Sequence, residues 1–175
     1  MKPDDIRPDV KLINSIHTLA VLRCEVKNYR YFADEKRKCI DEYAQSLKLF
    51  NDKIEFYDQE LKKIRSAGTS DGLGGFSPAS DVKFNELIKE KDKAEKEKHQ
   101  WLHDNNHQFY SDICWWQSRI DTVEHYLDHL KEDDRKFIND LYIEPIGFKN
   151  VMRRYEISNE GNIYRKANNI LRKVL

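Results

Sequence analysis

Apolar residues recur along two long stretches of the chain at alternating steps of three and four. The first series is Ile40, Tyr43, Leu47, Phe50, Ile54, Tyr57, Leu61 and Ile64. The second series is Phe109, Ile113, Trp116, Ile120, Val123, Leu127 and Leu130. Heptad spacing sustained over this length is typical of helices that pack along one another. The sequence therefore predicts two long helices in contact.

A less regular apolar face extends the first predicted helix toward the N-terminus. Asp9 is a suitable N-cap, so a continuous helix would run from Asp9 to Arg65. The charge density between residues 33 and 38 is high. A break in the helix at that point is the alternative.

A glycine-rich stretch, Ser66–Ser80, separates the two predicted helices. It holds four of the six glycines and a proline, and neither helix can continue through it. Proline is well suited to the first position of a helix, so Ser77–Pro78 marks the start of the returning helix. The two helices then form an antiparallel hairpin, and pairing about this tip places Arg65 opposite Asp81.

Two short helices are predicted beyond residue 131, where the long series ends. The first runs from Asp134 to Tyr142, with Asp133 and Asp134 as possible caps. The second runs from Phe148 to Tyr155 and ends in a tight turn. Its apolar face comprises Phe148, Val151, Met152 and Tyr155.

A final helix follows that turn, with Ser158 as its predicted N-cap. Its apolar stripe comprises Ile163, Ala167, Ile170 and Val174. A short helix, a turn and a longer helix with a basic, amide-rich outer face are typical of a helix-turn-helix. A small helical cap with a merely solvated outer face is the alternative.

These patterns predict an all-α protein with two domains. Residues 1–130 would form a long antiparallel helical hairpin, or coiled coil, with its tip at 66–80. Residues 131–175 would form a helix-turn-helix DNA-binding domain.

The charge distribution favours the same division. The chain has 31 basic and 31 acidic residues, hence no net charge. Residues 146–175 carry seven basic and two acidic residues, a net charge of +5, so the other 145 residues carry −5. A basic end on an acidic body is typical of a nucleic-acid-binding module.

The side chains on the outer face supply the chemistry for reading DNA, since Arg pairs with guanine, Asn pairs with adenine, and cations neutralise phosphates. The expected base contacts are Asn159, Glu160, Asn162, Arg165, Lys166 and Asn169. The expected phosphate contacts are Lys149, Arg153, Arg154, Ser158, Arg172 and Lys173.

Other classes of protein find little support. Three cysteines without a CxxC pair indicate neither a disulfide framework nor a structural zinc site, and favour a reduced cytoplasm. No signal peptide or membrane span is expected. His-x-x-x-His spacings occur, but a solvated helix face explains them better than a metal site. No catalytic set is present, so neither an enzyme nor a cofactor is predicted.

The run from Leu127 to Leu175 resembles the helix-turn-helix of sigma-factor region four. It is most similar to the ArpU-like late transcriptional regulators of phages that infect Gram-positive bacteria. The matching features are Leu130 before an acidic turn, Ile138 to Tyr142, an Ile157–Ser158 turn, and Ile163-Tyr164-Arg165 at the start of the recognition helix. The chain departs from the family in having Glu156 where glycine is common, Met152 where a small residue is common, and a longer interval before Ile163.

The resemblance implies sequence-specific DNA binding that controls phage gene expression in the bacterial cytoplasm, with RNA polymerase as a candidate partner. The hairpin would provide a homodimer contact or dock another protein. The rival hypothesis is a phage accessory protein that acts through its coiled-coil surface and binds no DNA.

Overall fold

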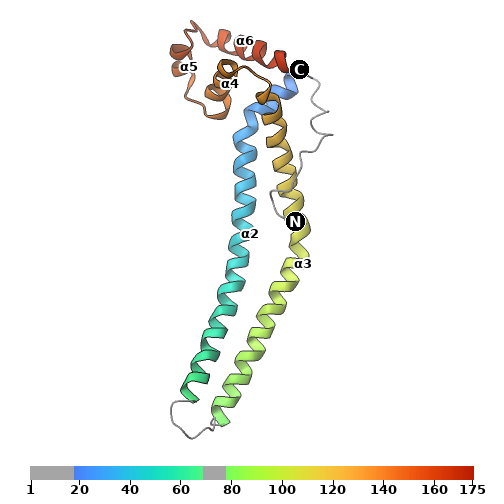
Figure 1. Cartoon of the computed structure of the whole chain (residues 1–175), viewed down its shortest axis with the longest axis vertical. Helices are drawn as coiled ribbons and strands as arrows, with labels where there is room; N and C mark the ends of the chain where they lie inside the picture. Colours follow the sequence, from blue (N-terminus) through green and yellow to red (C-terminus); the bar gives the residue numbers. More distant parts are fainter. Residues whose placement is uncertain (1–17, 69–77) are drawn as a thin grey trace. The chain divides into compact units, whose positions relative to one another are not determined.

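The computed structural model describes residues 18–68 and 78–175, and every regular element among them is a helix. Two long helices, α2 (Leu19–Gly68) and α3 (Pro78–Asp128), precede a group of short ones (Figure 1). Helix α2 has no interruption between residues 33 and 38, so the alternative of a break there is wrong. The predicted helix start at Pro78 is confirmed. The predicted start at Asp9, and most of the predicted tip, lie outside the described residues.

The short elements follow α3 in the order α4 (Glu132–Ile138), the π-helix η2 (Asn139–Ile143), α5 (Phe148–Arg154), α6 (Glu160–Leu171) and the 3-10 helix η3 (Arg172–Val174). The contacts of the chain divide it into two compact units. The arm unit is Ile40–Tyr110, and the core unit comprises Met1–Cys39 with Ser111–Leu175. Both long helices contribute to both units.

In the arm unit, α2 and α3 run antiparallel, as three cross-helix contacts show. Tyr43 donates a hydrogen bond to Asn106. Lys53 Nζ lies 2.8 Å from Glu97 Oε2, and Lys91 Nζ lies 2.7 Å from Asp58 Oδ1. The predicted pairing of Arg65 with Asp81 is wrong by one helical turn, because the Arg65 guanidinium lies over the ring of Phe84.

The contact between α2 and α3 in the arm unit encloses few side chains. Most of the heptad residues on α2 are only half-buried, and Ile40 is exposed. The Tyr43 ring stacks on Phe109 with the ring centroids 3.8 Å apart. Ala94 is the only fully enclosed residue among the described residues of this unit. Two helices alone cannot enclose large side chains, so packing here is spread along a line.

The core unit buries one continuous apolar cluster. It draws Leu22 and Val26 from α2 and Val123 and Leu127 from α3. The short elements contribute Phe137, Ile138, Leu141, Ile143, Val151, Ile163, Ala167, Ile170 and Leu171. The ends of the two long helices therefore share one interior with α4, α5 and α6. The domain boundary predicted between residues 130 and 131 falls inside this interior.

Helix α4 begins two residues earlier than predicted, at Glu132. Its N-cap is Lys131, which makes no side-chain capping bond, so the prediction that Asp133 or Asp134 caps it is wrong. Glu132, Asp133 and Asp134 lie instead in the first turn, where negative charge interacts favourably with the helix dipole. The helix widens into η2, in which Glu144 N–H donates to Asn139 C=O at 2.8 Å.

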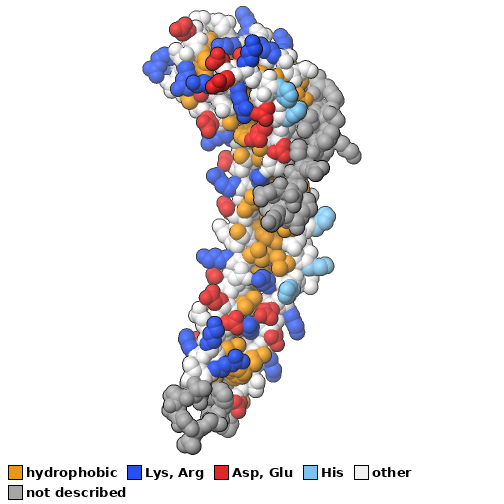
Figure 2. Space-filling model, in the orientation of Figure 1, with side chains coloured by type: hydrophobic (Ala, Val, Ile, Leu, Met, Phe, Trp, Pro, Cys, Tyr) orange, Lys and Arg blue, Asp and Glu red, His pale blue; other side chains and the backbone are white. Residues whose placement is uncertain are grey.

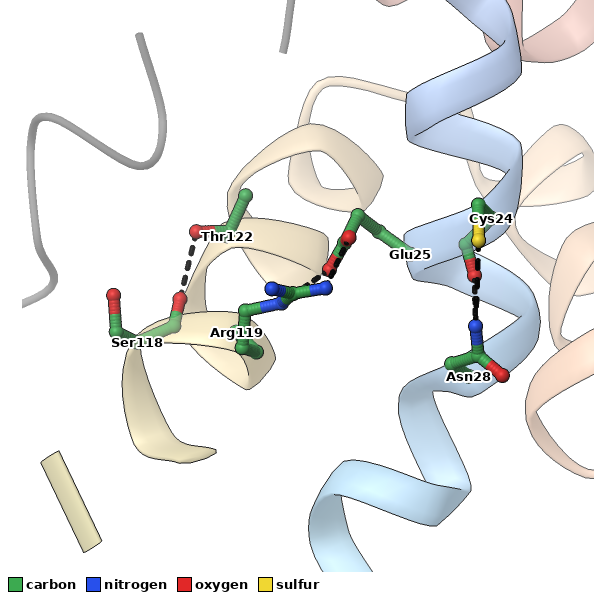
Figure 3. Close-up of polar contacts among 6 residues, drawn as sticks. All are labelled: Cys24, Glu25, Asn28, Ser118, Arg119 and Thr122. Carbon is green, nitrogen blue, oxygen red and sulfur yellow. Dashed lines mark hydrogen bonds and ion pairs between the residues drawn. The ribbon is translucent and has the colours of Figure 1, made fainter. Parts of the chain in front are cut away.

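A buried ion pair joins α2 to α3 in the core unit (Figure 3). Arg119 Nε donates to Glu25 Oε2 at 2.7 Å, and the second guanidinium nitrogen donates to Oε1. The Arg119 guanidinium also lies over the Phe32 ring, 4.9 Å from its centroid. The pair is bidentate, so it fixes how the two helix ends align beneath the short helices.

Candidate nucleic-acid interface

Helix α6 has one buried face and one exposed face. Ile163, Ala167, Ile170 and Leu171 are enclosed by the core. Three of them belong to the predicted apolar stripe; Val174 is only half-buried, and Leu171 was not predicted. The exposed side carries Arg165, Lys166 and Asn169. The polar stripe of α6 is therefore not packed against the long helices.

The N-cap of α6 is Asn159, so the prediction that Ser158 caps it is wrong by one residue. The Asn159 side-chain oxygen accepts a hydrogen bond from the Asn162 N–H at 3.0 Å. A Cβ atom at Gly161 would lie 3.3 Å from that oxygen, so the glycine leaves room for the cap. The Asn162 side-chain amide donates to Ser158 Oγ at 3.4 Å. Asn159 therefore has a structural role that competes with its expected role as a base reader.

The turn between α5 and α6 takes its shape from Glu156. Its φ of 53° is the only positive φ at a non-glycine residue in the described part of the chain. The Ile157 N–H donates to Met152 C=O at 2.9 Å, a bond that spans the end of α5. A left-handed residue after the helix, with this six-to-one bond, defines a Schellman motif. Glycine adopts this backbone conformation without strain, and here Glu156 adopts it with a Cβ atom.

Lys166 lies at the side of α6, above two aromatic rings. Its ammonium is 4.8 Å from the Phe137 centroid and 5.1 Å from the Tyr155 centroid. Those rings meet edge to face, 4.9 Å apart. An ammonium over aromatic faces is attracted by their negative quadrupole, so this side chain is held in place. Lys166 is exposed, but it is directed toward the edge of α6 rather than along its outer face.

A shallow hollow of about 330 Å³ lies along the same side of α6. Four of the six expected base contacts line it, Asn162, Arg165, Lys166 and Asn169, and the other lining residues are Asp134, Ile170 and Lys173. Lys173 Nζ lies 2.5 Å from Asp134 Oδ2. The pairing reduces the charge that Lys173 can offer to a phosphate.

Asp140 holds the C-terminal end of α5 in place. It accepts a hydrogen bond from the Tyr155 hydroxyl at 2.6 Å and pairs with Arg154 at 2.7 Å. Burial favours the neutral acid, but the bonds from Tyr155 and Arg154 outweigh burial and lower the pKa of Asp140. Burial, followed by the bond to Asp140, raises the pKa of Tyr155 to about 12. The Arg154 guanidinium is therefore already paired with a carboxylate of the same unit.

The structure brings most of the predicted contacts to the surface of the core unit. Eleven of the twelve expected DNA contacts are exposed, and Asn162 is half-buried. Figure 2 shows Lys and Arg side chains over the end of the molecule that holds α4–α6, with acidic side chains among them. The base and phosphate roles themselves remain predictions.

No protein-family model, curated protein or solved structure matches this chain.

Neither a membrane-spanning helix nor a cluster of metal-ligating side chains occurs among the described residues. None of the helices there has both the length and the apolar character that a bilayer span requires. Within the same residues, no three His, Cys, Asp or Glu side chains are grouped so that they could hold a metal ion.

One cation near α6 was missed by the sequence reasoning. The Lys27 ammonium, from α2, lies 5.7 Å from the Tyr164 centroid on α6 and 5.6 Å from the Tyr142 centroid. The basic excess predicted the interface only within residues 146–175, and Lys27 belongs to the remainder of the chain, whose net charge is negative. The only sequence signal for the position of Lys27 was the apolar spacing of Leu22 and Val26, which places Lys27 next to the buried face of the helix.

Proposed function

We propose that this protein is a sequence-specific DNA-binding transcriptional regulator. Residues 148–171 act as its helix-turn-helix, with α5 as the first helix and α6 as the recognition helix. The observation that supports this best is the two-faced character of α6. Its apolar side is enclosed, while Arg165 and Asn169 extend from a face that no helix of residues 18–68 or 78–175 covers.

In this mechanism, α6 enters the major groove with its exposed face toward the base edges. Arg165 donates two hydrogen bonds to guanine, and Asn169 pairs bidentately with adenine. Arg153 and Lys149 on α5, and Arg172 after α6, neutralise phosphates and hold the register. Asn159 caps α6 and Lys166 points to its side, so Arg165, Asn169 and Asn162 carry most of the sequence readout.

The resemblance to ArpU-like regulators supports a role in phage late-gene expression. Under that proposal the protein acts in the bacterial cytoplasm as an activator, and RNA polymerase is a candidate partner. A single basic module binds DNA weakly at physiological salt, so two linked modules would bind far better. A homodimer formed through the long helices would provide the second module.

A second candidate function is protein–protein interaction through the coiled hairpin, without DNA binding. The observation that favours it is a set of large apolar side chains on the long helices that are more than half exposed. Leu49 and Phe56 are 72% and 56% exposed, seven residues apart on one face of α2. Tyr31 and Trp115 are also more than half exposed.

The decisive experiment is selection of bound fragments from host and phage genomic DNA by the purified full-length protein. A regulator should enrich one motif, which a gel shift then tests with the double variant Arg165→Ala/Asn169→Ala. We expect the variant to lose at least about 30-fold in affinity for the motif and to keep its affinity for unrelated duplex, because each bidentate base contact contributes about 1–3 kcal/mol.

Lys48→Ala is the matched control. Lys48 is an exposed lysine of the arm unit. Failure to enrich any motif, with tight capture of a protein partner instead, would overturn the DNA-binding proposal in favour of the second candidate. Equal binding of the motif by the double variant would show that α6 does not read it.

A further inference from the structure

Three basic residues lie along one side of α2 where it enters the core unit. Arg23, Lys27 and Arg30 are separated by four and then three positions, so they share one face of the helix. Lys27 and Arg30 are exposed, and Arg23 is half-buried. We call these three residues the α2 basic row. They lie outside the region expected to contact DNA.

The α2 basic row reaches α6 through Lys27. The Lys27 ammonium lies above both Tyr142 of η2 and Tyr164 of α6. Burial raises the pKa of Tyr142, Tyr164 adds to the rise, and the positive charge of Arg23 opposes it. Arg23 is therefore also close to this aromatic pair. The row is continuous with the flank of α6.

Lys27 and Lys166 lie on opposite flanks of α6. Tyr164 and Lys166 are two positions apart, which corresponds to about 200° around an α-helix. The exposed face with Arg165 and Asn169 lies between them. Each lysine ammonium is held over two aromatic rings, Lys27 over Tyr142 and Tyr164, and Lys166 over Phe137 and Tyr155. The exposed face of α6 is thus bordered by a fixed positive charge on each side.

The α2 basic row has no acidic partner among the described residues, in contrast to Arg37 of α2 and Arg119 of α3. Arg37 pairs with Asp34, and Arg119 pairs with Glu25. Arg23, Lys27 and Arg30 form no ion pair within residues 18–68 and 78–175. Their charge therefore remains available to an anion outside the fold.

We propose that the α2 basic row is a second phosphate-binding surface, which contacts the DNA strand on the Tyr164 side of α6 while Lys166 contacts the strand on the other side. This inference rests on the proposed function and extends its interface to the long helices. A helix in the major groove lies between two phosphate backbones about 12 Å apart across the groove. Positive charges on both flanks of α6 suit that arrangement, and a patch for an acidic protein would not need them on both sides.

The test measures how DNA affinity depends on salt for the full-length protein. Each phosphate contact adds about 0.9 to the slope of log K against log salt concentration. We expect Lys27→Gln to lower the slope by about one and to weaken binding about eightfold at 0.1 M salt, for specific and unrelated duplex alike. The triple variant that also carries Arg23→Gln and Arg30→Gln should lower the slope by about three.

Two control variants separate charge from folding. Lys27→Arg keeps the charge and the contact with the rings, so it should bind as the native protein does. Lys48→Gln removes the same charge from an exposed site of the arm unit, 21 residues further along the sequence. It should leave the slope unchanged. Circular dichroism should show equal helix content in every variant.

The possible outcomes distinguish failure of this inference from failure of the proposed DNA-binding function. If the native protein binds its motif and the triple variant has the native slope, the α2 basic row does not touch DNA and this inference alone fails. If the triple variant binds DNA normally but loses an acidic protein, the row is a protein-binding surface and the inference is likewise overturned. If the native protein binds no duplex at all, both proposals fail.

Discussion

The two units of this protein are built from the same two long helices but are stabilised in different ways. In the core unit, three short helices cover the helix ends and enclose side chains such as Phe137 completely. In the arm unit, the described parts of α2 and α3 pack only against each other, and Phe50 and Tyr43 remain partly exposed. Enclosure requires a third layer of structure. The exposed polar face of α6 therefore lies on the unit that can hold a side chain in one position.

The largest expected difference comes from removing the same side chain in each unit. Phe137→Ala should lower the free energy of unfolding by about 3–5 kcal/mol, because it empties the centre of the cluster. It should also release Lys166 and Tyr155, which both lie against that ring. Phe50→Ala should cost only about 1–2 kcal/mol, because that ring is already partly exposed to water. Urea denaturation followed by circular dichroism measures both values.

Equal losses in the two variants would mean that the arm unit is enclosed by something beyond the described residues, such as a second copy of the chain. Sedimentation equilibrium on the same samples would then detect the dimer.

Ion pairs provide the next contrast. Glu25→Gln should lower the free energy of unfolding by about 3 kcal/mol, because it leaves the Arg119 guanidinium without a carboxylate in a site where Glu25 is only 7% exposed. Glu97→Gln in the arm unit breaks the pair with Lys53, in which both side chains are 41% exposed. That variant should be indistinguishable from the native protein.

The double variant Glu25→Met/Arg119→Met removes both charges together. It should recover most of the stability lost in Glu25→Gln, since replacing a whole buried pair by apolar side chains is often nearly neutral. A double variant as unstable as the single one would show that the Arg119 contacts with Phe32 and Trp115 matter more than its charge.

How far the sequence predicts this structure also differs between the units. The heptad series predicts both long helices and their contact, because a period near 3.5 has no other stable outcome. It misplaces their register by one turn. Register depends on individual pairs such as Arg65 with Phe84 and Tyr43 with Asn106, and a loop closes with several alignments at similar cost.

In the core unit the sequence predicts the short helices but not their ends. Lys131 and Asn159 are the N-caps, whereas an Asp and Ser158 were expected. The π-helix η2 and the left-handed Glu156 were not predicted either, because neither has a periodic signal. The exposed face of α6 is predictable from its own polar stripe. The contact of Lys27 with Tyr164 is not, since it joins residues far apart in the chain.

Acid should act on the core unit through Asp140. Its pKa in the folded state lies below the ordinary 3.8, because the bonds from Tyr155 and Arg154 outweigh burial. A lowered folded-state pKa stabilises the protein above pH 3.8 and loses that contribution as the pH falls through the folded value. Asp140→Asn should cost about 1–2 kcal/mol at pH 7, since it weakens the hydrogen bond from Tyr155.

Near pH 3 the difference between Asp140→Asn and the native protein should shrink. Thermal melts between pH 7 and pH 3, followed by the near-ultraviolet signal of the tyrosines, measure this. A difference that stays constant over the whole range would mean that the Asp140 carboxylate does not stabilise the fold through its charge.

The smallest expected effect is a gain, and it concerns the turn that sets α6 in place. Glu156→Gly should raise the free energy of unfolding by about 0.5–1 kcal/mol, because glycine adopts a φ of 53° without the cost of a Cβ atom. Glu156→Ala keeps the Cβ atom and should give no gain, so it separates backbone strain from the loss of a negative charge. If both variants gain equally, repulsion between Glu156 and nearby acids is the cause rather than its backbone. A gain for glycine alone would instead show that the packing of the core unit holds this turn in a backbone conformation that Glu156 does not favour.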